Sequence, residues 1–377
     1  MSEQEKFDTI PSDEDKGFAP IGMVPIRESD TYKKKKAEAY DLITNKKGYS
    51  RALRTAKIEE AMRTSEFPLL FGDIIDRELG WKYTSIGTPL SPLFRNKTVT
   101  RIGEPSAWYR GFGVASRLKA VGEQGQYPAR RLDEERYTIQ VDKYGATVPI
   151  SWETDVNDDL GFFDTISEDL ATSATNTDAW IQTGTFLDAN GPRAAVFTSN
   201  GGQTAVSNLP LNIDNLATAV QEMAEYLSDE GEPINNRPHY LVVGPALELM
   251  ARSILTSANR IIAGDTDRTL GERNVLSGYG LELIVDPWIP VVANNVANTA
   301  WFLVSDVAPA AGFARLSGHE SPQLWLKSAD AVQVGGGMVG AMMGSFDNDT
   351  ITYRIRHIVG ATNLDPLALW GSAGQIY

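Results

Sequence analysis

Residues 153–159 place four carboxylates within seven positions, a spacing that could bind calcium or supply a pair of catalytic acids. A calcium loop of the EF-hand type that began at Asp155 would need glycine at its sixth position and glutamate at its twelfth. Those positions hold Leu160 and Ile166, so the sequence excludes this calcium motif. The four acidic residues are Glu153, Asp155, Asp158 and Asp159.

The same acidic stretch fits the start of a helix. Asn157, Asp158 and Asp159 are all preferred N-cap residues, and negative charge is favoured beside the free N–H groups of a first turn. The pattern predicts a helix over about 159–183, roughly 37 Å long, with these residues as a structural N-cap. Apolar residues follow at the spacing of one helical face, namely Phe163, Ile166, Leu170, Ala174 and Ile181.

Other chemical motifs are missing from the sequence. It contains no G-x-x-x-x-G-K-[ST] phosphate loop, no H-E-x-x-H zinc motif and no G-x-S-x-G nucleophile elbow. Residues 335–340 match G-x-G-x-x-G, but a dinucleotide site also needs an acid about twenty residues later, where Ile355 stands. The histidines have no metal-ligand spacing and are interpreted as structural. We therefore predict no catalytic residue, no metal site and no cofactor; the histidines are His239, His319 and His357.

Length and composition limit the remaining possibilities. A chain of 377 residues is too long for one compact core, and hydrophobic residues at 42% are enough to fill at least two lobes. The absence of cysteine excludes disulfides and thiolate chemistry, and it is compatible with a reducing cytoplasm. Because no stretch approaches the ~20 apolar residues of a membrane span and the N-terminus is polar, neither a membrane segment nor a signal peptide is expected.

Charge divides the chain into a basic segment and an acidic remainder. Residues 31–63 hold ten Lys or Arg and four Asp or Glu, whereas the rest holds 25 basic and 45 acidic residues. The acidic remainder should not adhere to nucleic acid, whose affinity for proteins comes largely from phosphate neutralisation. The basic segment could contact nucleic acid or an acidic partner, or it could be a solvated helix face. Its candidate contact residues are Lys33, Lys34, Lys35, Lys36, Lys46, Lys47, Arg51 and Arg54.

The first half of the chain predicts an arm followed by a β-ribbon. Residues 1–30 are polar, acidic and interrupted by proline, so we expect them to be disordered. Alternating apolar residues around 108–114 and 137–152 predict two long strands joined by a hydrophilic tip. The alternation shifts by one residue after Val141, which predicts a β-bulge near residues 142–143.

The second half predicts helices mixed with short strands. Apolar spacing indicates a helix over 213–227, ended by Gly231 and Pro233, and another beginning at Pro245 with Leu247, Met250 and Ile254 on one face. A long polar loop at 257–278 is expected at an interface. The order of elements predicts an α+β fold, with strands at 240–243, 281–285, 300–304, 324–326, 331–334 and 350–359.

Three stretches share the pattern of a known family: "TSEFPLLFGDIIDRELGWKY" (64–83), "YTIQVDKYGATVPISWETDVNDDLGFF" (137–163) and "YRIRHIVGATNLDPLAL" (353–369). The middle stretch is the most specific, because a strand ends in an aromatic and an acidic residue before Asn-Asp-Asp-Leu-Gly opens a helix. Over about residues 64–370, and in the same order, the sequence resembles the major capsid proteins of tailed bacteriophages.

The resemblance implies the Hong Kong 97-type capsid fold, an α+β fold with an N-terminal arm, an extended β-ribbon loop, a long spine helix, a peripheral domain and an axial domain. The implied ranges are 1–97 for the arm and 98–152 for the extended loop. The peripheral domain would cover 153–234, with the spine helix at about 159–183. Residues 235–345 would form the axial domain, and 346–377 the return strand of the peripheral domain and the C-terminus.

The resemblance also implies a structural role in a virion and no enzymatic activity. Subunits would form hexamers and pentamers of an icosahedral shell around double-stranded DNA, assembled in the bacterial cytoplasm. Implied partners are other copies of the chain, a scaffold protein, a portal and in some cases decoration proteins, with DNA held by weak non-specific contact and no membrane. Two alternatives remain at this point: an encapsulin-type nanocompartment shell, and a carboxylate-dependent hydrolase centred on Glu153 and Asp159.

Overall fold

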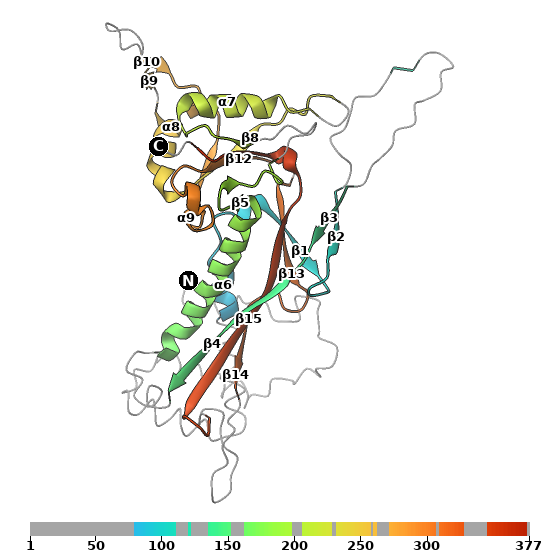
Figure 1. The fold of residues 1–377 in the computed structure, drawn as a ribbon, viewed down its shortest axis with the longest axis vertical. Coiled ribbons are helices and arrows are strands. Elements are labelled where there is room, and N and C mark those ends of the chain that lie inside the picture. Colours follow the sequence, from blue (N-terminus) through green and yellow to red (C-terminus); the bar gives the residue numbers. More distant parts are fainter. Residues whose placement is uncertain are drawn as a thin grey trace, which may run out of the picture. The chain divides into compact units, whose positions relative to one another are not determined.

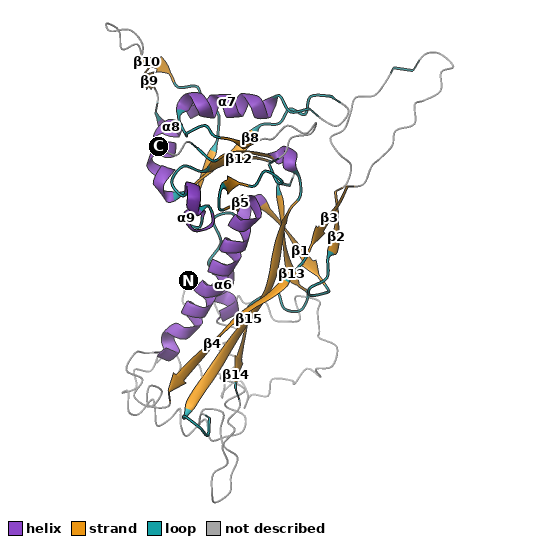
Figure 2. Ribbon diagram, in the orientation of Figure 1, coloured by secondary structure: helices purple, strands orange, loops and turns teal. Residues whose placement is uncertain are grey.

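The computed structural model describes residues 79–110, 120–121, 135–151, 162–197, 206–227, 231–257, 259–261, 271–306, 309–327 and 345–374. The chain divides into two compact units, Met1–Phe71 and Gly72–Tyr377, and every described residue belongs to the second. This second unit is a mixed α/β fold that contains two five-stranded sheets (Figures 1 and 2). Within the described part of the chain, no helix is long and apolar enough to cross a bilayer.

The first sheet is organised around one long strand, β15 (Thr350–Asn363). Its order is β1-β13-β15-β14, and β4 pairs with β15 along residues 350–359. The strand pairs with β14 and then with β13 farther along, which explains why it is so long. The other strands are β1 (Phe94–Val99), β4 (Asp142–Ser151), β13 (Ala311–Leu316) and β14 (Gln323–Leu326).

A 25-residue helix, α6 (Phe162–Phe186), packs along β15 (Figure 1). Alternate residues of β15 point toward α6 because side chains of a strand alternate between its two faces. Apolar side chains of the helix and the strand form one buried cluster with residues of the helical segment 79–85. Its buried members are Leu79, Tyr83, Ile150, Leu170, Ala171, Ala174, Ile351, Tyr353 and Ile355.

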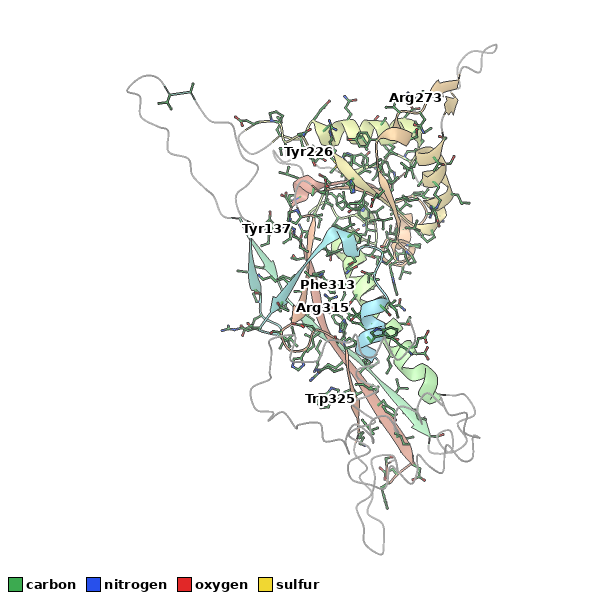
Figure 3. The ribbon with its side chains drawn as sticks, turned by 180° about the vertical axis from the view of Figure 1, so that it is seen from behind. Tyr137, Tyr226, Arg273, Phe313, Arg315 and Trp325 are labelled. Carbon is green, nitrogen blue, oxygen red and sulfur yellow. The ribbon has the colours of Figure 1, made fainter. Side chains whose placement is uncertain are left out.

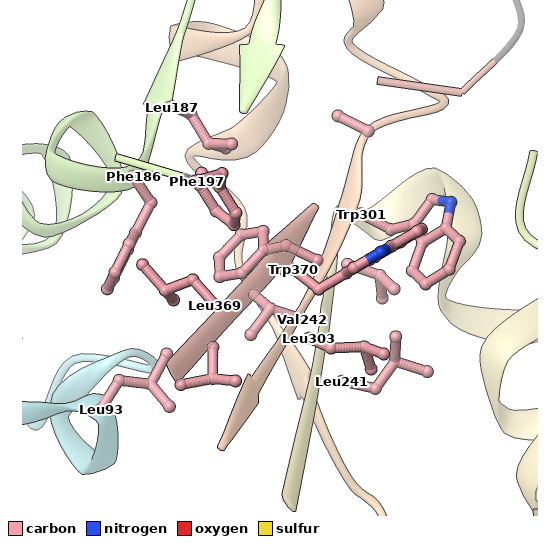
Figure 4. Packing of buried hydrophobic residues seen from close by; sticks show 14 of the residues in the cluster. Leu93, Phe186, Leu187, Phe197, Leu241, Val242, Trp301, Leu303, Leu369 and Trp370 are labelled. Carbon is pink, nitrogen blue, oxygen red and sulfur yellow. The ribbon is translucent and has the colours of Figure 1, made fainter. Parts of the chain in front are cut away.

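The second sheet has the order β11-β8-β12-β16-β7 and contains the larger core. Trp301 on β12 and Trp370 on β16 lie at the centre, with ring centroids 4.9 Å apart (Figure 4). Three helices belong to this part: α7 (Ile213–Ala224), α8 (Glu248–Thr256) and α9 (Ile289–Val292). The strands are β7 (Val206–Ser207), β8 (Pro238–Val243), β11 (Glu282–Val285), β12 (Trp301–Ser305) and β16 (Leu369–Ser372).

Short pairings complete the described part. The antiparallel pair of β2 (Ser106–Arg110) and β3 (Glu135–Ile139) lies near the first sheet, where the Lys97 ammonium donates to the Ala107 carbonyl over 2.5 Å. The other pairs are β5 (Leu187–Asp188) with β6 (Gly191–Pro192), and β9 (Asn259–Ile261) with β10 (Gly271–Arg273). Short 3₁₀ turns occur at Ser91–Leu93, Pro245–Leu247, Leu276–Gly278, Asn294–Val296 and Pro366–Ala368.

Several predicted elements are confirmed and others need correction. The long helix is α6, and the strands predicted at 240–243, 281–285, 300–304, 324–326 and 350–359 are all present. The second helix, however, ends at Ala224, and Leu227 instead bridges to Pro233. Of the face predicted for the helix after Pro245, Ile254 is buried and Leu247 packs against the core, but Met250 is 49% exposed and Ala251 is buried in its place. The strand predicted at 331–334 lies outside the described residues.

The predicted β-bulge near residues 142–143 is replaced by a change of sheet. β3 ends at Ile139 and pairs with β2, whereas β4 begins at Asp142 and pairs with β15. The ribbon therefore does not continue through residue 152 as predicted. The shift in apolar alternation therefore marks the point where the chain stops pairing with β2 and begins to pair with β15.

Gly360 on β15 makes this crossing possible. A Cβ atom at Gly360 would lie 1.9 Å from the carbonyl oxygen of Gln140, in the step between β3 and β4. Only glycine permits so close a backbone approach. By contrast, a Cβ atom at Gly184 in α6 would meet nothing within 4 Å.

The C-terminal half of α6 is joined to the second sheet through Asp286, which directly follows β11. The Thr183 hydroxyl donates to Asp286 Oδ2 over 2.6 Å, and the Trp288 N–H donates to Oδ1 over 3.0 Å. Asp286 is 1% exposed. Burial raises the pKa of its carboxyl, although the hydrogen bonds from Thr183 and Trp288 oppose the shift.

The glycine contacts predict opposite effects for two glycine-to-alanine substitutions. We expect Gly360→Ala to lower the free energy of unfolding by about 2–4 kcal/mol, because a methyl group there forces the backbone apart. The matched control Gly184→Ala should raise it by about 0.5–1 kcal/mol, since alanine favours the helix. Urea titration followed by circular dichroism measures both. Equal changes in the free energy of unfolding would contradict the close approach of Gly360 to the backbone of Gln140.

The buried carboxyl predicts a pH dependence. Because the pKa of Asp286 is raised in the fold, the unfolded chain releases this proton at lower pH, and stability contributed by the protonated group is lost as the pH rises through the folded value. In that window the free energy of unfolding of the wild-type chain should fall by up to about 1.4 kcal/mol per pH unit. Asp286→Asn, which cannot ionise, should not show this fall. Thermal unfolding from about pH 4 to about pH 8 tests this. An unchanged slope in the variant would refute it.

Candidate functional site

The sequence-predicted site residues fall outside the described part of the chain. Asn157, Asp158 and Asp159 lie within residues 152–161, immediately before α6, and the glycines of 335–340 are likewise not described. The same holds for every residue of the basic segment, which belongs to the first unit of the chain. The N-cap role and the basic-arm contact therefore stay predictions.

The described residues bring a different polar group together around Asp178 of α6. Its carboxylate is 2% exposed, and it accepts a hydrogen bond from the Tyr83 hydroxyl at Oδ2 over 2.5 Å. His357 Nε2, on β15, lies 2.8 Å from Oδ1. Since a carboxylate only accepts, Nε2 is the nitrogen that donates. Two distant parts of the chain thus converge on one buried acid of α6.

Arg315 of β13 supplies positive charge to this group (Figure 3). Its guanidinium lies 4.0 Å from Asp178 Oδ2 and donates to the Tyr83 oxygen over 3.2 Å. It also stacks on the Phe313 ring, 4.8 Å from the centroid. Burial and then the Asp178 charge raise the pKa of Tyr83, so this hydroxyl keeps its proton and remains a donor. We call Tyr83, Asp178, Arg315 and His357 the polar junction.

The polar junction fastens the segment 79–88 to α6. Beyond Tyr83, the Thr88 hydroxyl donates to Gln182 Oε1 over 2.7 Å, and Gln182 is itself buried. The Lys82 ammonium reaches Glu168 over 3.6 Å, but Glu168 is largely exposed and such a pair contributes little. The segment therefore meets the helix at Glu168, Asp178 and Gln182, which span about four helical turns.

The geometry of the polar junction is structural and not catalytic. Asp178 and His357 are 2% and 3% exposed, so a substrate has no approach to them. A shallow cavity of about 330 Å³ lies elsewhere, lined by Arg237, His239 and Asp306 among others. Among the described residues, no three His, Asp or Glu side chains could jointly hold a metal ion. A buried carboxylate with several donors holds packed elements in one arrangement.

The three histidines lie apart, each with its own partner. His357 pairs with Asp178, His239 Nε2 lies 4.0 Å from Glu282, and His319 Nδ1 lies 2.7 Å from Gln323 Nε2. This separation agrees with the structural interpretation of the histidines in the sequence.

The sequence contains signals for two of the four residues of the polar junction. Asp178 stands four residues after Ala174, which places it on the buried face of the predicted helix. His357 stands two residues after Ile355, on the inward alternation of the predicted strand. An acid and a histidine at buried positions of two neighbouring elements predict a pair. Tyr83 and Arg315 carry no such signal.

Comparisons with known proteins place the chain in a family. A family model described as phage capsid protein matches residues 134–371, more than half of the chain. No curated protein matches the sequence.

Solved structures with a similar course of the chain include one of Mycobacterium phage Adephagia (11% identity, TM-score 0.48, covering 78% of this chain and 91% of that one). A second is the capsid of the cyanophage P-SCSP1u (11%, 0.48, 76% and 87%). A third is the holo-SrpI encapsulin complex from Synechococcus elongatus (10%, 0.41, 75% and 85%).

The family match bears on the hydrolase alternative centred on Glu153 and Asp159, because the family is structural. A carboxylate-dependent hydrolase is therefore set aside. The chain belongs to the phage capsid protein family, as a bacteriophage major capsid protein that forms the shell of the virion and is not an enzyme.

Proposed function

We propose that subunits of this shell protein assemble as hexamers and pentamers into an icosahedral shell that encloses double-stranded DNA. The observation that supports this most directly is α6, a 25-residue helix packed along the central strand of one sheet and joined to a second sheet through Asp286. This is the arrangement expected of a Hong Kong 97-type subunit, with a spine helix between two domains. A well-packed subunit suits this role, since the same surfaces recur on every copy of the shell.

The domain assignment follows from the same elements. The sheet around β15 together with α6 would be the peripheral domain, and the sheet of β8, β11 and β12 with α7 and α8 would be the axial domain. The pair β2–β3 would be the base of the extended loop, and the segment 79–88 the root of the N-terminal arm. In this proposal β13 and β14 join the peripheral domain, whereas β16 joins the axial domain, which changes the boundaries expected at 235–345 and 346–377.

The proposed partners are other copies of the chain, a scaffold protein, a portal and decoration proteins. DNA would meet the shell weakly, because the chain outside residues 31–63 carries 45 acidic and 25 basic residues. Repulsion of that kind lets a polyanion move without adhering. The basic residues 33–54 would be the exception and would meet either the scaffold or the genome.

Electron microscopy with light scattering on the purified chain, alone and with a candidate scaffold protein, tests assembly. We expect closed shells or rings of five and six subunits, because each subunit makes several weak contacts that a closed shell satisfies together. The contents of shells isolated from infected cells separate a phage head, which holds DNA, from an encapsulin-type compartment, which holds protein. A monomer under all conditions would refute the proposal.

The basic arm has its own test. Replacing Lys33, Lys34, Lys35 and Lys36 with glutamine removes four charges that could neutralise phosphate or acidic side chains. We expect shells of this variant to retain less DNA, or to recruit less scaffold, in a salt-dependent manner. A variant with four distant lysines changed is the control for net charge. Wild-type retention of both ligands would exclude the arm as their contact.

The polar junction predicts the effect of Asp178→Asn. The substitution removes the charge that holds Arg315 and weakens the hydrogen bonds from Tyr83 and His357, so we expect unfolding to become easier by about 2–4 kcal/mol. Asp169→Asn, at an exposed position of the same helix, should change stability by less than about 0.5 kcal/mol. Thermal unfolding measures both variants.

Tyr83→Phe removes only one hydroxyl from the junction. We expect it to cost about 1–2 kcal/mol and to expose the segment 79–88 to limited proteolysis, because this segment loses its buried hydrogen bond. An unchanged cleavage rate would show that the junction does not fasten the segment.

A further inference from the structure

A cationic and aromatic face lies on the first sheet, on the side away from α6. Paired residues of adjacent strands share a face, and the register pairs Trp325 of β14 with Arg354 of β15, and Gln323 with Arg356. Across β15, Arg354 and Arg356 pair with Thr147 and Gly145 of β4, and Lys143 falls on the same alternation. We call Lys143, Trp325, Arg354 and Arg356 the cationic face (Figure 3 labels Trp325).

The two arginines of this face are held in place. The guanidinium carbons of Arg354 and Arg356 lie 5.6 Å and 5.1 Å from the Trp325 ring centroid. Arg356 also donates to Gln323 Oε1 over 2.5 Å, and Gln323 contacts His319. Trp325 nevertheless stays 46% exposed. A planar guanidinium fixed in this way is preorganised for a bidentate carboxylate or phosphate ligand.

The cationic face has no internal acid to neutralise it. Among the residues of β4, β14 and β15, the sole acid is Asp142, which alternates to the opposite face. Arg356 Nε is buried and has no hydrogen-bond partner in the described part of the chain. The strands of this sheet therefore leave the positive charge of the cationic face without an acidic partner of their own.

We infer that the cationic face is a contact between subunits that recognises carboxylates of a second copy of this chain. Charge complementarity favours this occupant, because the chain has 49 acidic and 35 basic residues and every copy offers surplus carboxylates. Three cations fixed on a sheet give little affinity for DNA, which requires many phosphate contacts. In a shell the same small contact repeats in every subunit and gains by avidity. The inference rests on the proposed assembly.

The double substitution R354E/R356E tests the inference through the assembly of the full-length chain, followed by light scattering over a range of salt concentrations. We expect the subunit concentration needed for assembly to rise at least about ten-fold, because like charges would then meet across the contact. The control R237E/R273E makes the same change in net charge at two exposed arginines elsewhere. It should leave the threshold within about two-fold of wild type.

Binding of each variant to a short fluorescent DNA duplex separates the two possible occupants. Unchanged DNA binding with impaired assembly is the expected result. Normal assembly with weakened DNA binding would overturn the inference in favour of a nucleic-acid contact. Equal loss of assembly in R354E/R356E and its control would also overturn it, because net charge alone would then be the cause. If the wild-type chain itself does not assemble, the proposed function fails first.

Hydroxyl-radical labelling of the wild-type chain gives a test that needs no variant and so does not depend on the folding of R354E/R356E. Trp325 should be labelled in free subunits and several-fold less in shells, because a second copy covers it. Trp301, which is fully buried in the second sheet, should react in neither state and reports that the fold is intact. Equal labelling of Trp325 in free subunits and shells would overturn the inference.

Discussion

The buried carboxylate of Asp178 is the interaction on which the rest of this fold depends. A charge that has left water is tolerated only where donors and a counter-charge surround it, and here they come from segments far apart in the sequence. Tyr83, Arg315 and His357 can satisfy Asp178 together only if the segment 79–88, β13, β15 and α6 are all in place. The requirement makes packing of these four elements cooperative, and it fixes the rotation of α6 against the sheet.

A second buried acid, Asp286, contacts the same helix but is held by neutral donors. Its partners are a hydroxyl and a backbone N–H, and burial raises the pKa of its carboxyl. Asp178 lies in α6 and contacts the first sheet through His357. Asp286 follows β11 of the second sheet and contacts the helix at Thr183, five residues after Asp178. The helix therefore links the position of the first sheet to that of the second through a short stretch, while the described residues of its N-terminal half pack against the first sheet and the segment 79–88.

Strong periodicity made much of this fold predictable. α6 and β15 follow from apolar spacing, since each turns one face to a core, whereas β8 and β12 follow from short continuous apolar runs, since they are buried on both faces. β13 and β16 were missed because small residues such as Ala311 and Gly371 interrupt the apolar pattern, and β1 was missed because polar residues fill its interior; the burial of all three depends on neighbours distant in sequence. The polar junction could be predicted only in part, because Asp178 and His357 occupy recognisable inward positions but Tyr83 and Arg315 gain their roles through tertiary packing. The clustering of acidic residues drew attention to 153–159, whereas Asp178, the acid at the centre of the polar junction, has no acidic neighbour in the sequence.

The position of β16 in the second sheet has a consequence for the order of folding during synthesis. β16 lies between β12 and β7, and its Trp370 packs on Trp301 and donates to Glu222 of α7 over 2.7 Å. Until residues 369–372 have emerged from the ribosome, one edge of β12 has no partner within this sheet and the Trp301 ring lacks its cover. A nascent chain that stops before residue 369 thus exposes an unpaired strand edge and apolar surface, which chaperones and proteases recognise. Only a chain translated past residue 372 can therefore complete this core.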